Sequence, residues 1–134
     1  MNLRLFLAGA KGSGRAMIRV KRVYDPPSAD DGTRVLVDRL WPRGISKERA
    51  RIDLWLKEVA PSADLRKWYG HDPDRWEEFR RRYRAELSAK KDLILTLKEQ
   101  AGHGTITLVY SSREEMRNNA VALRMYLEER EWLG

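Results

Sequence analysis

The sequence contains no cysteine and only two histidines. The absence of cysteine excludes disulfides, thiol nucleophiles, iron–sulfur clusters and cysteine-based zinc sites. Two histidines are too few for a histidine-built metal cage, so we expect neither a metal nor another cofactor. No apolar run approaches the roughly 20 residues that a membrane-spanning helix needs. We therefore expect a soluble, cytoplasmic protein with no membrane partner.

The chain has enough apolar residues for one folded domain. Its 134 residues match the usual size of a single domain, and 42% of them are hydrophobic. The formal net charge of +7 is unevenly distributed, because residues 1–24 hold six of the 27 basic residues and none of the acidic ones. The rest of the chain is nearly neutral. Nucleic-acid binding, if present, should therefore be weak and non-specific.

Residues 1–16 differ from the rest in composition. Residues 9–16 read GAKGSGRA and have the outer glycines of a phosphate-binding loop. They lack the lysine and the hydroxyl that carry out the chemistry of such a loop. We expect residues 1–16 to be a flexible extension and residues 17–134 to be a single α/β domain.

From residue 17 onward, strand patterns alternate with helix patterns. Residues 18–24 alternate apolar and basic side chains, and residues 34–40 and 105–110 are further strands with apolar centres. Apolar residues follow helical spacing over residues 76–97, with a candidate break at residues 90–92. The candidate helix N-caps are Ser46, Ser62 and either Asn118 or Ser112. The pattern predicts a three-layer α/β domain, with a small, mostly parallel sheet flanked by helices.

Charged and aromatic residues follow three of the predicted strands. If the strands are parallel, these segments converge on one crevice at the carboxyl edge of the sheet, where α/β proteins bind ligands. The candidate ligand-binding residues are Arg22, Arg39, Trp41, Arg43 and Tyr110. The arginines would bind a phosphate or carboxylate, and Trp41 would stack against a ring. The structural alternative places Trp41 in the core.

Two residues are candidates for proton transfer. Asp38 follows a buried strand, where it could act as a base or orient an arginine; the structural alternative is an ion pair with Arg39. His71 lies beside Asp72 in the loop before the long helix and is a candidate general base. Its structural alternative is a hydrogen bond at the helix entry. Ser111 has no visible partner base, so a serine nucleophile is poorly supported.

Several long motifs point to a known family. The sequence reads VDRLWPRGISK at residues 37–47, WLKEVAPS at residues 55–62 and HDP at residues 71–73. In these motifs the chain resembles the YeaO-like family of uncharacterised bacterial proteins, which carry a domain of unknown function. The resemblance covers about residues 17–130. It departs from the family at residues 111–114 and at Asn119, where the family often has a histidine.

The resemblance bears on the direction of the first two strands. Residues 25–33 are short for a parallel crossover, so spacing alone favours an antiparallel hairpin. The resemblance implies a parallel sheet, with Asp38, Arg39 and Pro42 in a motif after the second strand. We follow the resemblance and expect parallel strands.

The activity of the family is not established, so the resemblance implies a fold and a site without a reaction. Our first hypothesis is a small enzyme or binding protein for an anionic small molecule. The second is a nucleic-acid-associated protein that uses Trp41 and the arginine-rich helix over residues 80–84. The third is a non-catalytic regulatory or interaction domain.

Overall fold

Four parallel strands form the central sheet in the computed structural model, which describes residues 17–133. The strands are β2 (Ile18–Arg22), β3 (Thr33–Leu36), β4 (Leu54–Trp55) and β5 (Ile106–Tyr110). They lie in the order β2-β5-β3-β4, and every neighbouring pair is parallel. The predicted α/β fold with a parallel sheet is therefore confirmed. The flexible extension predicted for residues 1–16 lies outside the described residues.

The connection from β2 to β3 is short because it crosses β5 as a single turn. β5 lies between the two strands, and the connection contains the 3-10 turn η1 (Ala29–Asp31). The hydroxyl of Thr107 on β5 donates to the carbonyl oxygen of Asp31 at 2.7 Å. Gly32 has a φ of +61°, and a Cβ there would lie 2.1 Å from the carbonyl oxygen of Thr105, so only glycine fits. The antiparallel hairpin that the spacing of residues 25–33 favours is wrong.

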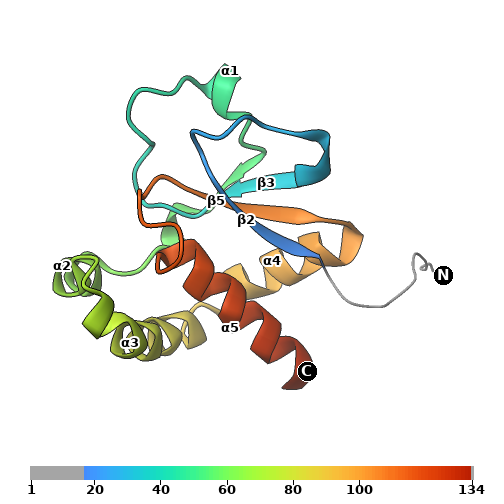
Figure 1. The fold of residues 1–134 in the computed structure, drawn as a ribbon. Coiled ribbons are helices and arrows are strands. Elements are labelled where there is room, and N and C mark those ends of the chain that lie inside the picture. Colours follow the sequence, from blue (N-terminus) through green and yellow to red (C-terminus); the bar gives the residue numbers. More distant parts are fainter. Residues whose placement is uncertain (1–16, 134) are drawn as a thin grey trace.

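Helices cover the two faces of the sheet unequally, as Figure 1 shows. On one face lie α2 (Ala63–Tyr69), α3 (Trp76–Ser88), α4 (Lys91–His103) and α5 (Asn119–Leu133). The other face is covered by loops and by α1 (Lys47–Ala50). Two further 3-10 turns are η2 (Lys57–Val59) and η3 (Pro73–Arg75). No helix within residues 17–133 is both long and apolar enough to cross a membrane.

Side chains cap three of these helices at positions that the sequence predicts. Ser46, Ser62 and Asn118 each accept the backbone N–H of the residue three positions further along, at 3.2, 3.1 and 2.9 Å. These bonds satisfy N–H groups that have no partner inside the helix. The predicted break at residues 90–92 is also confirmed, because α3 ends at Ser88 and α4 begins at Lys91.

The larger core lies between the sheet and the four helices. α3 contributes Phe79, Tyr83 and Leu87, which are spaced four residues apart on one helical face and are each 1% exposed. Phe79 stacks on Tyr69 of α2, with ring centroids 4.3 Å apart. The hydroxyl of Tyr83 donates to the carbonyl oxygen of Val59 at 2.6 Å, which joins α3 to η2.

The opposite face of the sheet carries a smaller core and a buried ion pair. Five buried residues form this core: Val23, Leu36, Ile45, Ala50 and Val109. Arg34 on the same face is buried, and each of its side-chain nitrogens has an acceptor. Nη1 donates to Asp31 Oδ2 at 2.6 Å, while Nη2 and Nε donate to the carbonyl oxygen of Ala50 at 2.7 and 3.1 Å. The pair therefore joins η1 and β3 to the end of α1.

Several donors converge on the Asp31 carboxylate. It also accepts hydrogen bonds from Lys21 Nζ at 3.1 and 3.2 Å and from the backbone N–H of Ser28 at 3.0 Å. Burial raises the pKa of Asp31, but the hydrogen bonds from Ser28, Lys21 and Arg34 together lower it by more than burial raises it. The pKa of Asp31 consequently lies below its ordinary value of 3.8, and the carboxylate is charged at neutral pH.

Replacing Phe79 by alanine tests the larger core. Phe79→Ala should lower the free energy of unfolding by about 3–5 kcal/mol, because it leaves a cavity among buried rings. Leu95 is 56% exposed on α4 and serves as a matched control. Leu95→Ala should change the free energy by less than about 1 kcal/mol in the same urea titrations. Equal effects of the two substitutions would show that the α3 face is not core.

Replacing Asp31 by asparagine tests the buried ion pair. Asp31→Asn should cost about 3–5 kcal/mol at neutral pH, because it leaves Arg34 buried without a counter-charge. The exposed neighbour Asp30 provides the control, and Asp30→Asn should be nearly neutral. Urea titrations of both variants measure the difference.

The lowered pKa of Asp31 predicts that the destabilisation by Asp31→Asn depends on pH. The pKa of Asp31 is lower in the folded chain than in the unfolded chain. Its contribution to the free energy of unfolding is therefore fully present at pH values above the pKa that Asp31 has in the unfolded chain. That contribution is lost as the pH falls through the folded-state pKa. The stability difference between wild type and Asp31→Asn should therefore narrow below about pH 4. A difference that is constant from pH 7 to about pH 3 would contradict a charged role for Asp31.

Candidate functional site

The carboxyl ends of β2, β3 and β5 meet at one edge of the sheet. Arg22 lies opposite Tyr110 in the β2–β5 register, and Leu36 lies opposite Val109 in the β3–β5 register. Pairing continues one residue beyond the strands, where the N–H of Val23 donates to the Tyr110 carbonyl oxygen at 2.7 Å. The structure thus brings together the three segments that carry most of the candidate site residues.

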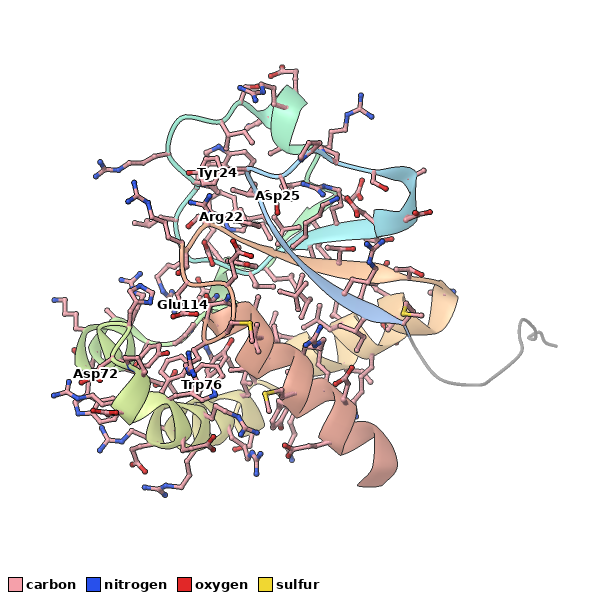
Figure 2. The ribbon with its side chains drawn as sticks, in the orientation of Figure 1. Arg22, Tyr24, Asp25, Asp72, Trp76 and Glu114 are labelled. Carbon is pink, nitrogen blue, oxygen red and sulfur yellow. The ribbon has the colours of Figure 1, made fainter. Side chains whose placement is uncertain are left out.

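Arg22 is half-buried at this edge and is held from one side. Its Nε donates to the carbonyl oxygens of Ser112 and Ser111 at 2.9 and 3.3 Å. Its guanidinium lies over the ring of Tyr24, 4.7 Å from the centroid, and Figure 2 shows the two residues next to each other. Within residues 17–133, neither terminal nitrogen of Arg22 has a hydrogen bond or an ion pair. Arg22 therefore presents two free N–H₂ groups on a fixed guanidinium.

Arg43 belongs to the loop that adjoins this group. The hydroxyl of Tyr24 donates to the carbonyl oxygen of Arg43 at 2.6 Å and so ties this loop to the end of β2. The Arg43 side chain is exposed and has no ion pair within the described part of the chain. The exposed Arg43 side chain thus belongs to a loop that is bonded to the end of β2.

Trp41 is half-buried and packs against the smaller core. Its Nε1 donates to the carbonyl oxygen of Ile45 at 2.8 Å. Its ring meets that of Trp55 edge to face, with centroids 5.6 Å apart and an interplanar angle of 71°. These contacts correspond to the structural alternative for Trp41 that the sequence leaves open.

Asp38 connects the loop after β3 to the loop after β5. Its Oδ2 accepts the backbone N–H and the hydroxyl of Ser111 at 2.9 and 2.7 Å. Its Oδ1 accepts the side-chain N–H of Asn119, the first residue of α5, at 3.1 Å. Asp38 is not paired with Arg39. The sequence gives no sign of a partner for Ser111 or of a role for Asn119, because these contacts join residues more than 70 positions apart.

Arg39 makes its contacts away from Arg22 and Arg43. Its Nη1 lies 3.5 Å from Glu58 Oε1, and its Nη2 donates to the carbonyl oxygen of Ala60 at 3.4 Å. Its Nε is buried and has no hydrogen-bond partner within the described residues. The candidate arginines therefore form two sets, one at the end of β2 and one at η2.

Tyr110 is part of the larger core. It is 3% exposed, and burial raises the pKa of its hydroxyl, with a further contribution from the negative charge of Glu115. The hydroxyl is protonated at neutral pH. Tyr110 thus lies beneath the edge of the sheet rather than on its surface.

His71 lies on the loop that precedes α3, and its charge helps to lower the pKa of Glu114 in the loop after β5. It is exposed and has a φ of +58°, and its ring centroid is 5.8 Å from that of Tyr69. The predicted helix-entry hydrogen bond is made by Asp72 instead, which accepts the N–H of Asp74 at 3.0 Å. Figure 2 shows Asp72 well separated from Arg22 and Tyr24. The two candidate proton-transfer residues share no hydrogen bond within residues 17–133.

The arginine-rich face of α3 is engaged in ion pairs. Arg81 and Arg82 bond to Glu78 at 2.6 and 2.8 Å, and Arg84 bonds to Glu129 of α5 at 2.7 Å. Hydrogen bonds from Arg81 and Arg82 lower the pKa of Glu78 to about 2. Among residues 17–133, no group of three or more histidine, aspartate or glutamate side chains is arranged to hold a metal ion.

Comparison with known proteins gives several matches. Residues 17–132 match a family described as the inactive DUF488-N3 subclade. Proteins of Mycobacterium tuberculosis and Mycobacterium bovis are each 44% identical over 113 residues, which cover 84% of this chain and 95% of the relative. The Escherichia coli protein YeaO is 42% identical over 110 residues, which cover 82% of this chain and 96% of YeaO. All three relatives are named as uncharacterized proteins, and no solved structure matches the chain.

The matches extend over almost the whole described chain. They include the carboxyl edge of the sheet, the turn η2 and the start of α5, where the candidate residues lie. The level of identity and the coverage agree with the motifs at residues 37–47, 55–62 and 71–73. The chain belongs to the YeaO-like family, in the group described as the inactive DUF488-N3 subclade.

Proposed function

We propose that this chain binds a small molecule that carries a phosphate or carboxylate group, at the carboxyl edge of its sheet, without catalysing a reaction. Arg22 is the principal anion-binding residue in this proposal, and Arg43 is the second. Trp41 and Tyr110 support the loop and the strand end rather than contacting the ligand.

The guanidinium of Arg22 is the observation that carries the proposal. Its Nε is bound to two carbonyl oxygens and its plane lies on Tyr24, so it loses little conformational freedom when a ligand binds. The two free terminal nitrogens match the two oxygens of a carboxylate or phosphate. A cation held in this way favours a bidentate anion over a diffuse polyanion.

Three observations favour binding over catalysis. The Asp38 carboxylate accepts three hydrogen bonds from Ser111 and Asn119, so it is not free to take a proton from a ligand. Asn119 stands where the family often has a histidine, and an amide does not transfer protons at neutral pH. His71 packs against Tyr69 and interacts with the charge of Glu114, and among the described residues it shares no hydrogen bond with Asp38. The description of the matched family as inactive agrees with this proposal.

The nucleic-acid alternative has less support. A surface that follows a phosphate backbone needs uncommitted cations, whereas the arginines of α3 are bonded to Glu77, Glu78 and Glu129. Trp41, which this alternative also needs, packs against Trp55. The regulatory alternative is compatible with anion binding and differs only in the consequence of ligand binding.

Substitution of Arg22 tests the proposal. Inorganic phosphate, citrate and AMP should raise the melting temperature, because a ligand that binds only the folded chain stabilises it. Arg22→Lys keeps the charge but loses the bidentate geometry, so it should weaken binding at least about tenfold in calorimetry. Arg49 is an exposed arginine on α1 and is the matched control, and Arg49→Lys should bind like wild type.

Two results would contradict the proposal. One is that none of these anions changes the melting temperature of the wild-type chain. The other is equal loss of binding in Arg22→Lys and Arg49→Lys, which would indicate a general effect of charge. Tight, sequence-dependent binding of a nucleic acid at physiological salt would favour the alternative instead.

A further inference from the structure

Two cations converge on the short turn η2 and the residue that follows it. Lys90, at the junction of α3 and α4, donates from Nζ to the carbonyl oxygens of Glu58 and Ala60 at 2.6 and 3.1 Å. Arg39 reaches the same Ala60 carbonyl oxygen from the loop after β3, at 3.4 Å. Lys90 and Arg39 are both half-buried. Two positive side chains thus share one carbonyl acceptor.

The two carboxylates near this pair contact it only weakly. Glu58 is the carboxylate that contacts Arg39, at 3.5 Å, and 71% of its side chain is exposed to solvent. The charge of Glu86 favours the charged form of Lys90, but both of its oxygens accept hydrogen bonds from Ser62, at 2.8 and 2.6 Å. An exposed ion pair at this distance contributes little stability. Glu58 is therefore a weak and replaceable partner.

One nitrogen of Arg39 lacks an acceptor, and burial disfavours the charge of Lys90. Nε of Arg39 is buried without a hydrogen-bond partner in the described part of the chain, and such a group is costly to leave unpaired. Burial lowers the pKa of Lys90, and the positive charge of Arg39 adds to that effect, while the negative charges of Glu86 and Glu58 oppose it. An anion placed between the two side chains would relieve both conditions.

We propose that Arg39 and Lys90 form a second binding site, for a small oxyanion of the phosphate type, and that Glu58 occupies this site when the oxyanion is absent. The two contacts of Arg39 are long, at 3.4 and 3.5 Å, so its guanidinium can turn its Nε edge toward a ligand. The oxyanion then accepts from Arg39 and Lys90, and the Glu58 carboxylate moves into solvent. This site uses none of the residues that bind the anion in the proposed function.

Titration with inorganic phosphate at constant ionic strength tests this site, with affinity measured by calorimetry. Glu58→Gln removes the internal competitor and should strengthen phosphate binding about threefold to fivefold. Lys90→Met removes one cation and should weaken binding at least about fivefold. Lys91 is the exposed neighbour, and Lys91→Met makes the same change in charge and shape outside the site. Lys91→Met should bind phosphate like wild type.

Three outcomes would contradict the second site. Unchanged or weaker phosphate binding in Glu58→Gln contradicts the role of Glu58 as an occupant, and this variant keeps the test valid if Lys90→Met does not fold. Equal weakening in Lys90→Met and Lys91→Met indicates a general charge effect. Phosphate binding that is abolished by Arg22→Lys alone places phosphate only at the end of β2, which supports the proposed function and refutes this one.

Discussion

The buried pair of Asp31 and Arg34 is the interaction on which the rest of the fold depends. The Arg34 side chain can be buried on one face of the sheet because it donates hydrogen bonds to the Asp31 carboxylate and to the carbonyl oxygen of Ala50, at the end of α1. Asp31 is charged in that position because Lys21 and Ser28 also donate to it. The pair fixes the short connection to β3, and the hydroxyl of Thr107 bonds the same connection to β5, which lies between β2 and β3. All three carboxyl ends then meet at one edge, where the candidate residues are.

Local physical signals predicted most of the elements but not the way the chain crosses the sheet. The caps at Ser46 and Ser62 and the break before Lys91 depend on neighbouring residues, so the sequence shows them directly. Spacing gave the wrong direction for the first strand pair because that rule assumes a helical crossover. Here one turn suffices, since Gly32 adopts a positive φ that a side chain would not permit. Strand β4 has only two residues, too few for a recognisable pattern.

The sequence predicted which segments meet at the carboxyl edge of the sheet, but not which side chains contact one another there. Strand ends marked the segments that carry Arg22 and Asp38, and a parallel sheet brings such ends together. The partner of each side chain depends on residues far away in sequence. Asp38 is bound to the loop after β5, and Arg39 is bound at η2 beside Lys90, a residue whose helical surroundings gave no sign of a site. No local pattern contains that information.

Both proposed anion sites depend on an arginine outside the arginine-rich helix: Arg22 at the end of β2 and Arg39 after β3. The guanidinium N–H signals of the arginines, both Nε–H and Nη–H, in a nitrogen-resolved NMR titration with phosphate test this most directly. The signals of Arg22 and Arg39 should shift and saturate, because each side chain has N–H groups without an acceptor among the described residues. Arg81 and Arg82, which are bonded to Glu78, should not move. Saturating shifts at Arg81 and Arg82, with Arg22 and Arg39 unchanged, would contradict the account.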